Sequence, residues 1–191
     1  WEDCFLEGGL TSAAAILSNM ATVMQVGLIL GAVDPGLLRH MWGPLMSGAA
    51  ATALYGVCLM FPKTATGANQ PIKVGGAFNL KLALIVTLTM TGITFVSSVM
   101  LSHFGQVGVM LTATLSGFAD AHASTASIAT LAKSGQLPFD AVVGPVLIAV
   151  SSNSVSKCVV AWVSGGRRFA AYVIPGQVLL TLALWAGMVL F

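Results

Sequence analysis

The sequence predicts an all-α protein that crosses a membrane several times as a bundle of helices. Hydrophobic residues make up 57% of the 191 residues and charged residues only 7%, whereas soluble proteins carry roughly 25% charged residues. The mean hydropathy is +0.92. Several uncharged apolar runs reach the roughly 20 residues that a helix needs to cross the core of a bilayer. Seven per cent of charged residues leaves too little polar surface to cover a water-soluble globule, so we expect an integral membrane protein.

Six membrane spans can be drawn along the chain. The predicted spans are residues 13–33, 41–61, 82–101, 104–132, 141–163 and 169–191. One clear loop, residues 62–81, is rich in Pro, Gly and Asn, and we expect it to lie outside the membrane. Barrel strands would alternate polar and apolar residues over about ten positions, which these runs do not, so helices are predicted. We expect a single transmembrane domain over residues 1–191.

Composition and motifs also exclude some classes of function. Eight basic residues and a net charge of +2 form no nucleic-acid-binding patch, so no nucleic acid partner is expected. The sequence contains no Walker loop, no G-x-S-x-G and no H-E-x-x-H, so we expect neither enzymatic activity nor a cofactor. The chain begins at Trp1 without a charged, cleavable leader, and we expect it to be a piece of something longer.

Two parts of the chain, residues 8–61 and 116–191, resemble each other and predict an internal repeat with a broken helix. The alignment pairs Gln25 with Lys157, Ile16 with Ile148, Thr22 with Ser154 and Val23 with Val155. Each copy ends in a span that contains a proline, Pro44 in the first and Pro175 in the second. Repeats of this kind are common in transporters, whose binding sites lie at the repeat interface near the middle of the membrane.

The stretch SGFADAHASTAS (116–127) places a carboxylate inside very apolar sequence. A helix through 112–127 would align five polar residues on one face, which we call the polar seam: Thr112, Ser116, Asp120, Ser124 and Ser127. An ionised carboxylate that faces lipid is costly, so Asp120 should face the bundle interior or water. Asp120 either caps a helix that starts after a break near Gly117, or handles an ion directly, or lies in an interfacial loop. The first two interpretations are compatible, because broken helices bind ions with their own ends.

His122 lies two residues from Asp120, so on a continuous helix the two side chains would diverge. The interpretations left open are a core or interfacial histidine, a metal ligand together with Asp120, and a proton relay. The identity of any metal is left unknown.

Asn153 and Lys157 are four residues apart and therefore share one face of the fifth predicted span. Lys157 either extends toward the lipid headgroups or pairs with Asp120, because paired burial offsets much of the desolvation of each charge. We predict that Asp120 faces this span, with Asn153 or Lys157 in direct or water-bridged contact.

Several of these residues carry a resemblance to a known family. The runs GFADAHASTASIATLAKSG, SSNSVSK, GGRR and VIPG resemble the uncharacterised C-terminal membrane domain of MgtC/SapB-like proteins. That domain typically shows a G-x-x-D-x-D-A element, an Asn and a Lys four apart, and a Gly-Gly-Arg turn. The matching positions are Gly117, Asp120, Ala123, Asn153, Lys157, Gly165, Gly166 and Arg167. His122 departs from the pattern, because the second acid of the element is usual at its position. The resemblance implies no established activity, only a loose link with magnesium limitation and membrane energetics.

Taken together, the sequence predicts a transporter or channel-like protein for a small inorganic cation or protons. Asp120, His122, Ser124, Asn153 and Lys157 would line its path. The alternative is a non-transporting membrane subunit or regulator, whose buried polar residues only specify helix packing. We expect the chain to contact the lipid bilayer of a bacterial or archaeal cytoplasmic membrane, and a homo-oligomer is left open.

Overall fold

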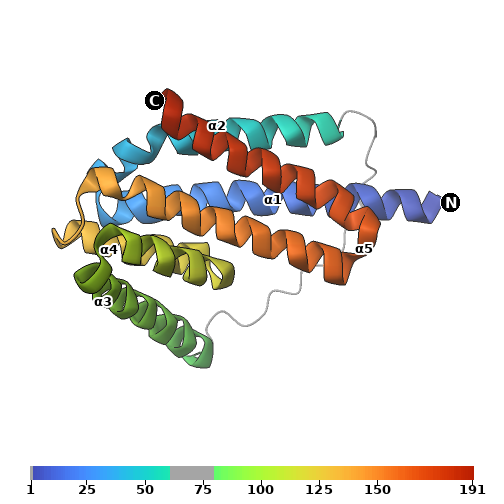
Figure 1. Ribbon diagram of the computed structural model, residues 1–191. Coiled ribbons are helices and arrows are strands. Elements are labelled where there is room, and N and C mark those ends of the chain that lie inside the picture. Colours follow the sequence, from blue (N-terminus) through green and yellow to red (C-terminus); the bar gives the residue numbers. More distant parts are fainter. Residues whose placement is uncertain (1, 61–79) are drawn as a thin grey trace.

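Helices account for almost all of the described chain (Figure 1). The computed structural model describes residues 2–60 and 80–191. Its elements are α1 (Glu2–Val33), α2 (Pro35–Met60), α3 (Leu80–Ala119), α4 (Ala121–Lys133), the 3₁₀ turn η1 (Phe139–Ala141) and α5 (Val143–Leu190). No strand occurs in these described residues, which confirms the all-α prediction. The predicted loop 62–81 lies outside them except for its last two residues, which begin α3.

Helix α5 folds back on itself and forms two antiparallel arms, residues 143–163 and Phe169–Leu190. Trp185 Nε1 donates a hydrogen bond of 3.1 Å to Ser151 Oγ. At 1.5 Å per residue, a straight helix would separate these residues by about 50 Å. The two arms correspond to the fifth and sixth predicted spans, and each lies within a stretch that is long and apolar enough to cross a membrane.

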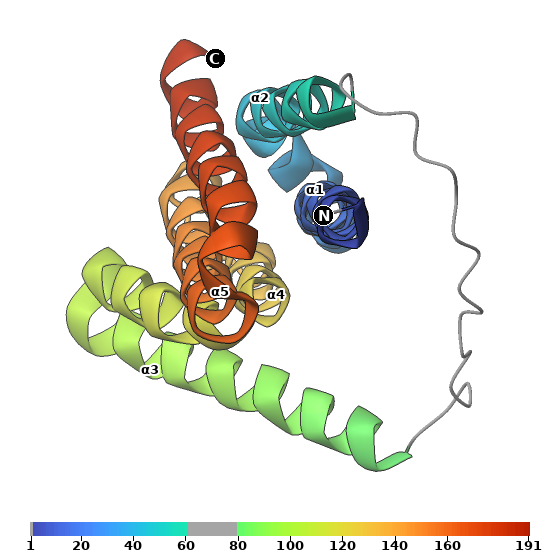
Figure 2. The ribbon, with the colours of Figure 1, turned by 90° about the vertical axis from the view of Figure 1, so that its right-hand side faces the viewer.

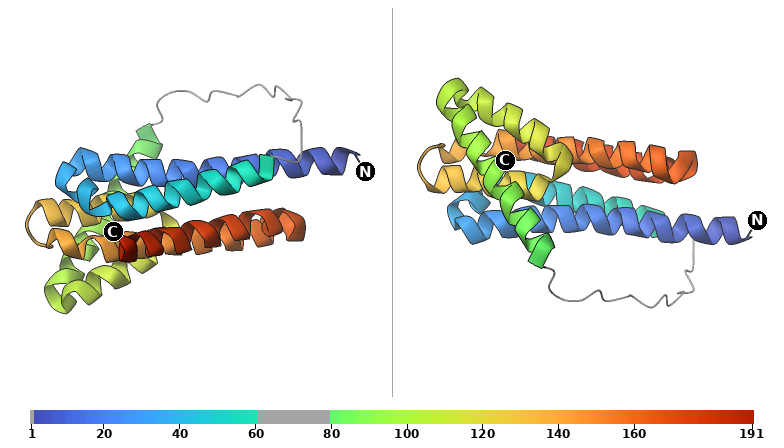
Figure 3. Two further views of the ribbon diagram at one scale, coloured as in Figure 1. Left: turned by 90° about the horizontal axis from the view of Figure 1, so that it is seen from above. Right: turned by 90° about the horizontal axis from the view of Figure 1, so that it is seen from below.

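Helix α3 also consists of two arms, residues 80–104 and 106–119. Gly105 lies between them with φ 58° and ψ −144°, a left-handed conformation that glycine adopts without a steric penalty. Gly108 then passes so close to the first arm that a Cβ there would overlap the carbonyl oxygen of Met100. The first arm crosses the outside of the bundle obliquely (Figures 2 and 3).

The fourth predicted span, 104–132, is wrong as a single crossing. Residues 106–119 and α4 form a helical hairpin that turns at Asp120. Ser116 Oγ and Ser124 Oγ lie 2.7 Å apart, although eight residues of continuous helix would separate them by about 12 Å. The two limbs have 14 and 13 residues, about 20 Å each, which is too short for the ~30 Å core of a bilayer.

Both ends of this hairpin lie at the same end of the bundle. Its first limb runs parallel to the first arm of α5, because Met110 packs near Gly144 and Gly117 packs against Ala149. The second limb returns to the end of α1, where Lys133 Nζ donates a hydrogen bond of 2.7 Å to the carbonyl oxygen of Val33. The hairpin is therefore re-entrant. The predicted count of six crossings is not confirmed. Three stretches of the described residues are long and apolar enough to cross a membrane, Phe95–Ala119, Phe139–Val163 and Phe169–Leu190, and Gly105 divides the first of them.

The remaining helices form two antiparallel pairs, α1 with α2 and the two arms of α5. Between the pairs, α2 and the second arm of α5 approach closely, because small residues line both. A Cβ on Gly187 would lie 2.8 Å from the carbonyl oxygen of Gly43. Ser47 Oγ donates to the carbonyl oxygen of Ala183 at 2.7 Å. Helix α1 runs antiparallel to the first arm of α5, and α2 runs antiparallel to the second arm (Figure 1). The internal repeat itself stays a prediction.

Large apolar side chains cover the outside of the bundle. Leu28, Leu115, Leu182 and Val163 are between 63% and 75% exposed. Such a surface would be unstable in water and suits contact with lipid acyl chains. The structure is therefore that of a membrane protein.

Gly117 provides a direct test of the hairpin packing. A Cβ at this position would lie 2.5 Å from the carbonyl oxygen of Ala149 and 2.8 Å from its Cα. Gly117→Ala should therefore destabilise the folded protein by about 1–3 kcal/mol, measured as a lower midpoint of unfolding in mixed micelles. Gly92→Ala is the control, because a Cβ at Gly92 meets nothing within 4 Å. Equal midpoints for the two variants would contradict the close packing.

Candidate functional site at the tip of the hairpin

Asp120 forms the turn between the two limbs of the hairpin. Its backbone is extended (φ −159°, ψ 114°), and its N–H still donates to the carbonyl oxygen of Ser116 at 2.8 Å, which completes α3. Its carboxylate then accepts the backbone N–H of His122 at 2.8 Å and caps α4. The irregularity expected near Ser116–Asp120 is thus present. The break lies at Asp120, whereas Gly117 is helical and serves the close approach to α5.

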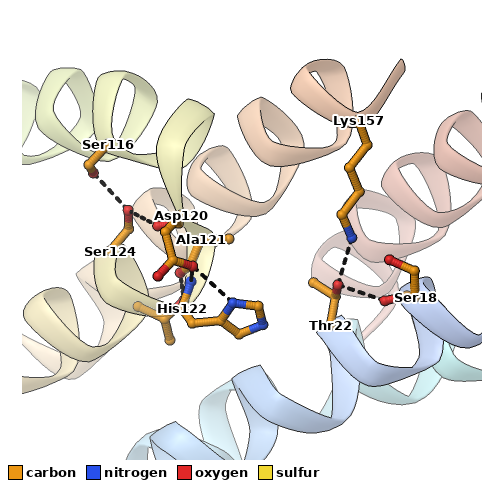
Figure 4. A network of polar contacts seen from close by, with 9 residues as sticks. Ser18, Thr22, Ser116, Asp120, Ala121, His122, Ser124 and Lys157 are labelled. Carbon is orange, nitrogen blue, oxygen red and sulfur yellow. Dashed lines mark hydrogen bonds and ion pairs between the residues drawn. The ribbon is translucent and has the colours of Figure 1, made fainter. Parts of the chain in front are cut away.

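His122 and Asp120 are brought together by this cap. His122 Nδ1 lies 2.9 Å from Asp120 Oδ1 (Figure 4). The divergence expected on a continuous helix does not arise, because the chain breaks at Asp120 and its extended backbone directs the carboxylate back over the first turn of α4. An ionised carboxylate accepts hydrogen bonds, so Nδ1 carries the proton in a neutral ring and Nε2 has a free lone pair. His122 Nε2 is buried and has no hydrogen-bond partner among the described residues.

Three of the five residues of the polar seam are buried, and the seam is folded over the hairpin rather than laid along one helix. Thr112 is 7% exposed on the first limb, and Ser124 and Ser127 are 1% and 2% exposed on the second. The hydroxyl of Ser116 lies against that of Ser124 across the turn. Ser124 Oγ also donates to the carbonyl oxygen of Asp120 at 2.8 Å. The seam therefore joins the two limbs directly behind the Asp120 turn.

Lys157 points into the bundle but does not reach Asp120. Its Nζ donates a hydrogen bond of 2.9 Å to Thr22 Oγ1 on α1 (Figure 4). Within the described part of the chain, no hydrogen bond or ion pair joins Asp120 to Lys157 or Asn153, so the predicted direct contact is absent. The hairpin tip packs at Ala149, and Lys157 lies eight residues beyond it, about 12 Å along the helix. A water-bridged contact stays a prediction. Lys157 does not extend toward the lipid headgroups, because its partner Thr22 is only 4% exposed.

A second buried polar pair was not singled out from the sequence. Gln177 Nε2 donates to Asn19 Oδ1 at 2.6 Å and joins the second arm of α5 to α1. Both side chains are 2% exposed. Each is a neutral amide that interrupts an apolar run, and this interruption is the signal that could have found them.

The described residues contain no group of three or more His, Cys, Asp or Glu side chains that could hold a metal ion. Asp120 and His122 offer two candidate ligands at the tip. A second histidine–carboxylate pair, His40 Nε2 and Asp140 Oδ1 at 3.1 Å, lies at the end of the bundle, where the Asp140 side chain is 92% exposed.

The lipid-facing bundle and its polar re-entrant hairpin define a polytopic helical membrane protein. The chain belongs to a family described as a domain of unknown function (DUF4010), which matches residues 7–165. It is also 30% identical over 108 residues to an uncharacterised protein of Aquifex aeolicus (strain VF5). That match covers 56% of this chain and 46% of the relative, so the chain spans about half of the relative's length. No solved structure matches. Neither description mentions MgtC/SapB-like proteins.

The cap and the charge of Asp120 can be separated by substitution. Asp120→Asn keeps an oxygen that accepts the His122 N–H, so its stability should stay near that of the wild type. Asp120→Ala removes this acceptor and should destabilise the protein by about 1 kcal/mol, within a range of 0.5–2. Thermal unfolding in detergent measures both variants. A loss of stability in Asp120→Asn as large as that in Asp120→Ala would show that the charge, not the cap, holds the hairpin together.

Proposed function

We propose that this protein transports protons or another small inorganic cation across the membrane, with the proton as the species that the site suits best. The observation that carries the proposal is the hydrogen-bonded pair of Asp120 and His122 at the tip of a re-entrant hairpin. Transport proteins commonly place ion sites at the ends of broken helices inside the bilayer.

Capping by itself does not require a carboxylate at position 120. Ser and Asn cap helices about as well as Asp, and both are neutral. An Asp at the centre of a membrane helix costs roughly 2.5–3.5 kcal/mol on insertion scales. A neutral cap would avoid this cost, so the charge favours a function over a purely structural role.

The geometry of His122 suits proton exchange. With Nδ1–H donated to Asp120, the free lone pair of Nε2 can take up a proton, and the carboxylate stabilises the imidazolium that results. The side chains of Asp120 and His122 are 42% and 29% exposed. His122 Nε2 itself is buried, so the proposal requires a water path to this atom.

The other predicted path residues have places in this scheme. Ser124 holds the tip, because it bonds both Ser116 and the carbonyl oxygen of Asp120. Asn153 and Lys157 follow Ala149 on α5, so they lie between the tip and the far end of the bundle. The competing proposal is a subunit or regulator without transport or catalysis, in which these groups only specify packing.

Proteoliposomes that contain a pH-sensitive dye test the proposal. A potassium diffusion potential should drive proton uptake into vesicles with the wild-type protein, and His122→Gln and Asp120→Asn should each abolish it. His103→Gln is the matched control, because His103 is exposed on α3 and its ring lies beside that of Phe104. Parallel tracer uptake of ²²Na⁺ or ⁸⁶Rb⁺ distinguishes protons from other cations.

Two results would contradict transport through the tip. The first is proton and tracer fluxes in wild-type vesicles no higher than in empty ones. The second is undiminished flux per folded molecule in Asp120→Asn, which would assign the carboxylate to packing alone.

A further inference from the structure

Two cavities lie between α4 with its following turn and the first arm of α3. The larger has a volume of about 500 Å³ and is lined by Thr91, Phe95 and Ser98 of α3 and by Ser127, Thr130 and Gln136, among others. The smaller has a volume of about 320 Å³ and is lined by Ser98, Val99, Leu101, Ser102 and Gln136. It lies near the Gly105 turn, at the end of the bundle where the hairpin begins and ends.

The two cavities share two lining residues, and these two are bonded to each other. Ser98 Oγ donates a hydrogen bond of 3.1 Å to Gln136 Oε1. Ser98 belongs to α3 and Gln136 follows the end of α4, so this single bond joins the two elements across the junction of the cavities. Both side chains are at least partly exposed. The bond can therefore open without exposing a buried core.

The larger cavity lies along the face of α4 that also carries Asp120, and its lining ends at Ala126 and Ser127. Asp120, Ser124, Ser127, Thr130 and Ser134 follow one another at steps of four, three, three and four residues and so share one face of α4. Ser127, Thr130 and Ser134 line the cavity. Ser127 lies seven residues from Asp120, about 10 Å along the helix, and Ser124 lies between them.

Hydroxyl groups line this cavity together with the apolar side chains of Phe95, Ala126 and Leu131. Each hydroxyl oxygen keeps acceptor capacity after donating to a backbone carbonyl, as Thr130 does to the carbonyl oxygen of Ala126 at 2.7 Å. A cavity of this size with several polar partners has room for several water molecules.

We propose that the larger cavity is a water-filled vestibule through which one side of the membrane reaches Asp120 and His122, and that the Ser98–Gln136 hydrogen bond gates its entrance. This inference rests on the proposed function only in the species that passes through the vestibule, protons or another small cation. Water access to the cavity can be measured without any transport.

Cysteine labelling in proteoliposomes tests the vestibule. In a background with Cys4, Cys58 and Cys158 replaced by Ala, Thr130→Cys should react with a membrane-impermeant, charged thiol reagent. The control is Leu182→Cys on the second arm of α5, which is 63% exposed but on an apolar surface. We expect Thr130→Cys to react at least about ten-fold faster, because a thiol needs water to ionise. Equal rates, or labelling of Thr130→Cys only by a membrane-permeant reagent, would show a lipid-filled groove and overturn the proposal.

The gate is tested in the Thr130→Cys background. Gln136→Ala and Ser98→Ala each remove the hydrogen bond, and both should raise the labelling rate about three-fold or more. Ser102→Ala is the control, because Ser102 lines only the smaller cavity and donates to the carbonyl oxygen of Val99. Unchanged rates in Gln136→Ala and Ser98→Ala would overturn the gate. Fast labelling without any ion flux in the wild type would refute the proposed function and leave the vestibule intact.

Discussion

The hydrogen bond from the His122 N–H to the Asp120 carboxylate is the interaction on which the hairpin depends. A helix that stops inside a membrane leaves backbone groups without partners, and no lipid can replace them. At Asp120 backbone groups at the end of α3 and at the start of α4 both find hydrogen-bond partners. Its own N–H completes the last turn of α3, and its carboxylate begins α4. The same carboxylate holds the imidazole of His122. Asp120 Oδ1 therefore both caps α4 and binds the His122 ring that the proposed function uses.

Close backbone contacts position this turn. Gly117 brings the first limb against the backbone of Ala149, and Gly105 and Gly108 reverse α3 before the hairpin begins. Lipid provides little hydrophobic driving force between helices, so association relies on close packing of small residues and on hydrogen bonds. Gly43, Ser47 and Gly187 do the same between α2 and α5. The polar tip is therefore positioned by close backbone contacts.

The polar groups of the interior are divided into separate contacts. Asp120 binds His122, Lys157 binds Thr22, and Asn19 binds Gln177. The first belongs to the hairpin, while the other two connect α1 to the arms of α5.

The sequence by itself determined the membrane class and the helical content, and it gave Asp120 as one possible helix cap. These follow from composition and from rules that act within a few residues, such as the preference of Asp for the start of a helix. It also identified Asp120, His122 and the hydroxyl residues of the polar seam, because polar side chains are rare in apolar runs. Only the tertiary structure decided that the chain reverses at Asp120, that His122 turns back onto it and that Lys157 reaches Thr22. Those outcomes depend on contacts such as Gly117 with Ala149 and Ser98 with Gln136, whose partners lie more than thirty residues apart. A broken helix that continues across the membrane and one that folds back have the same local sequence, and packing between distant segments selects between them.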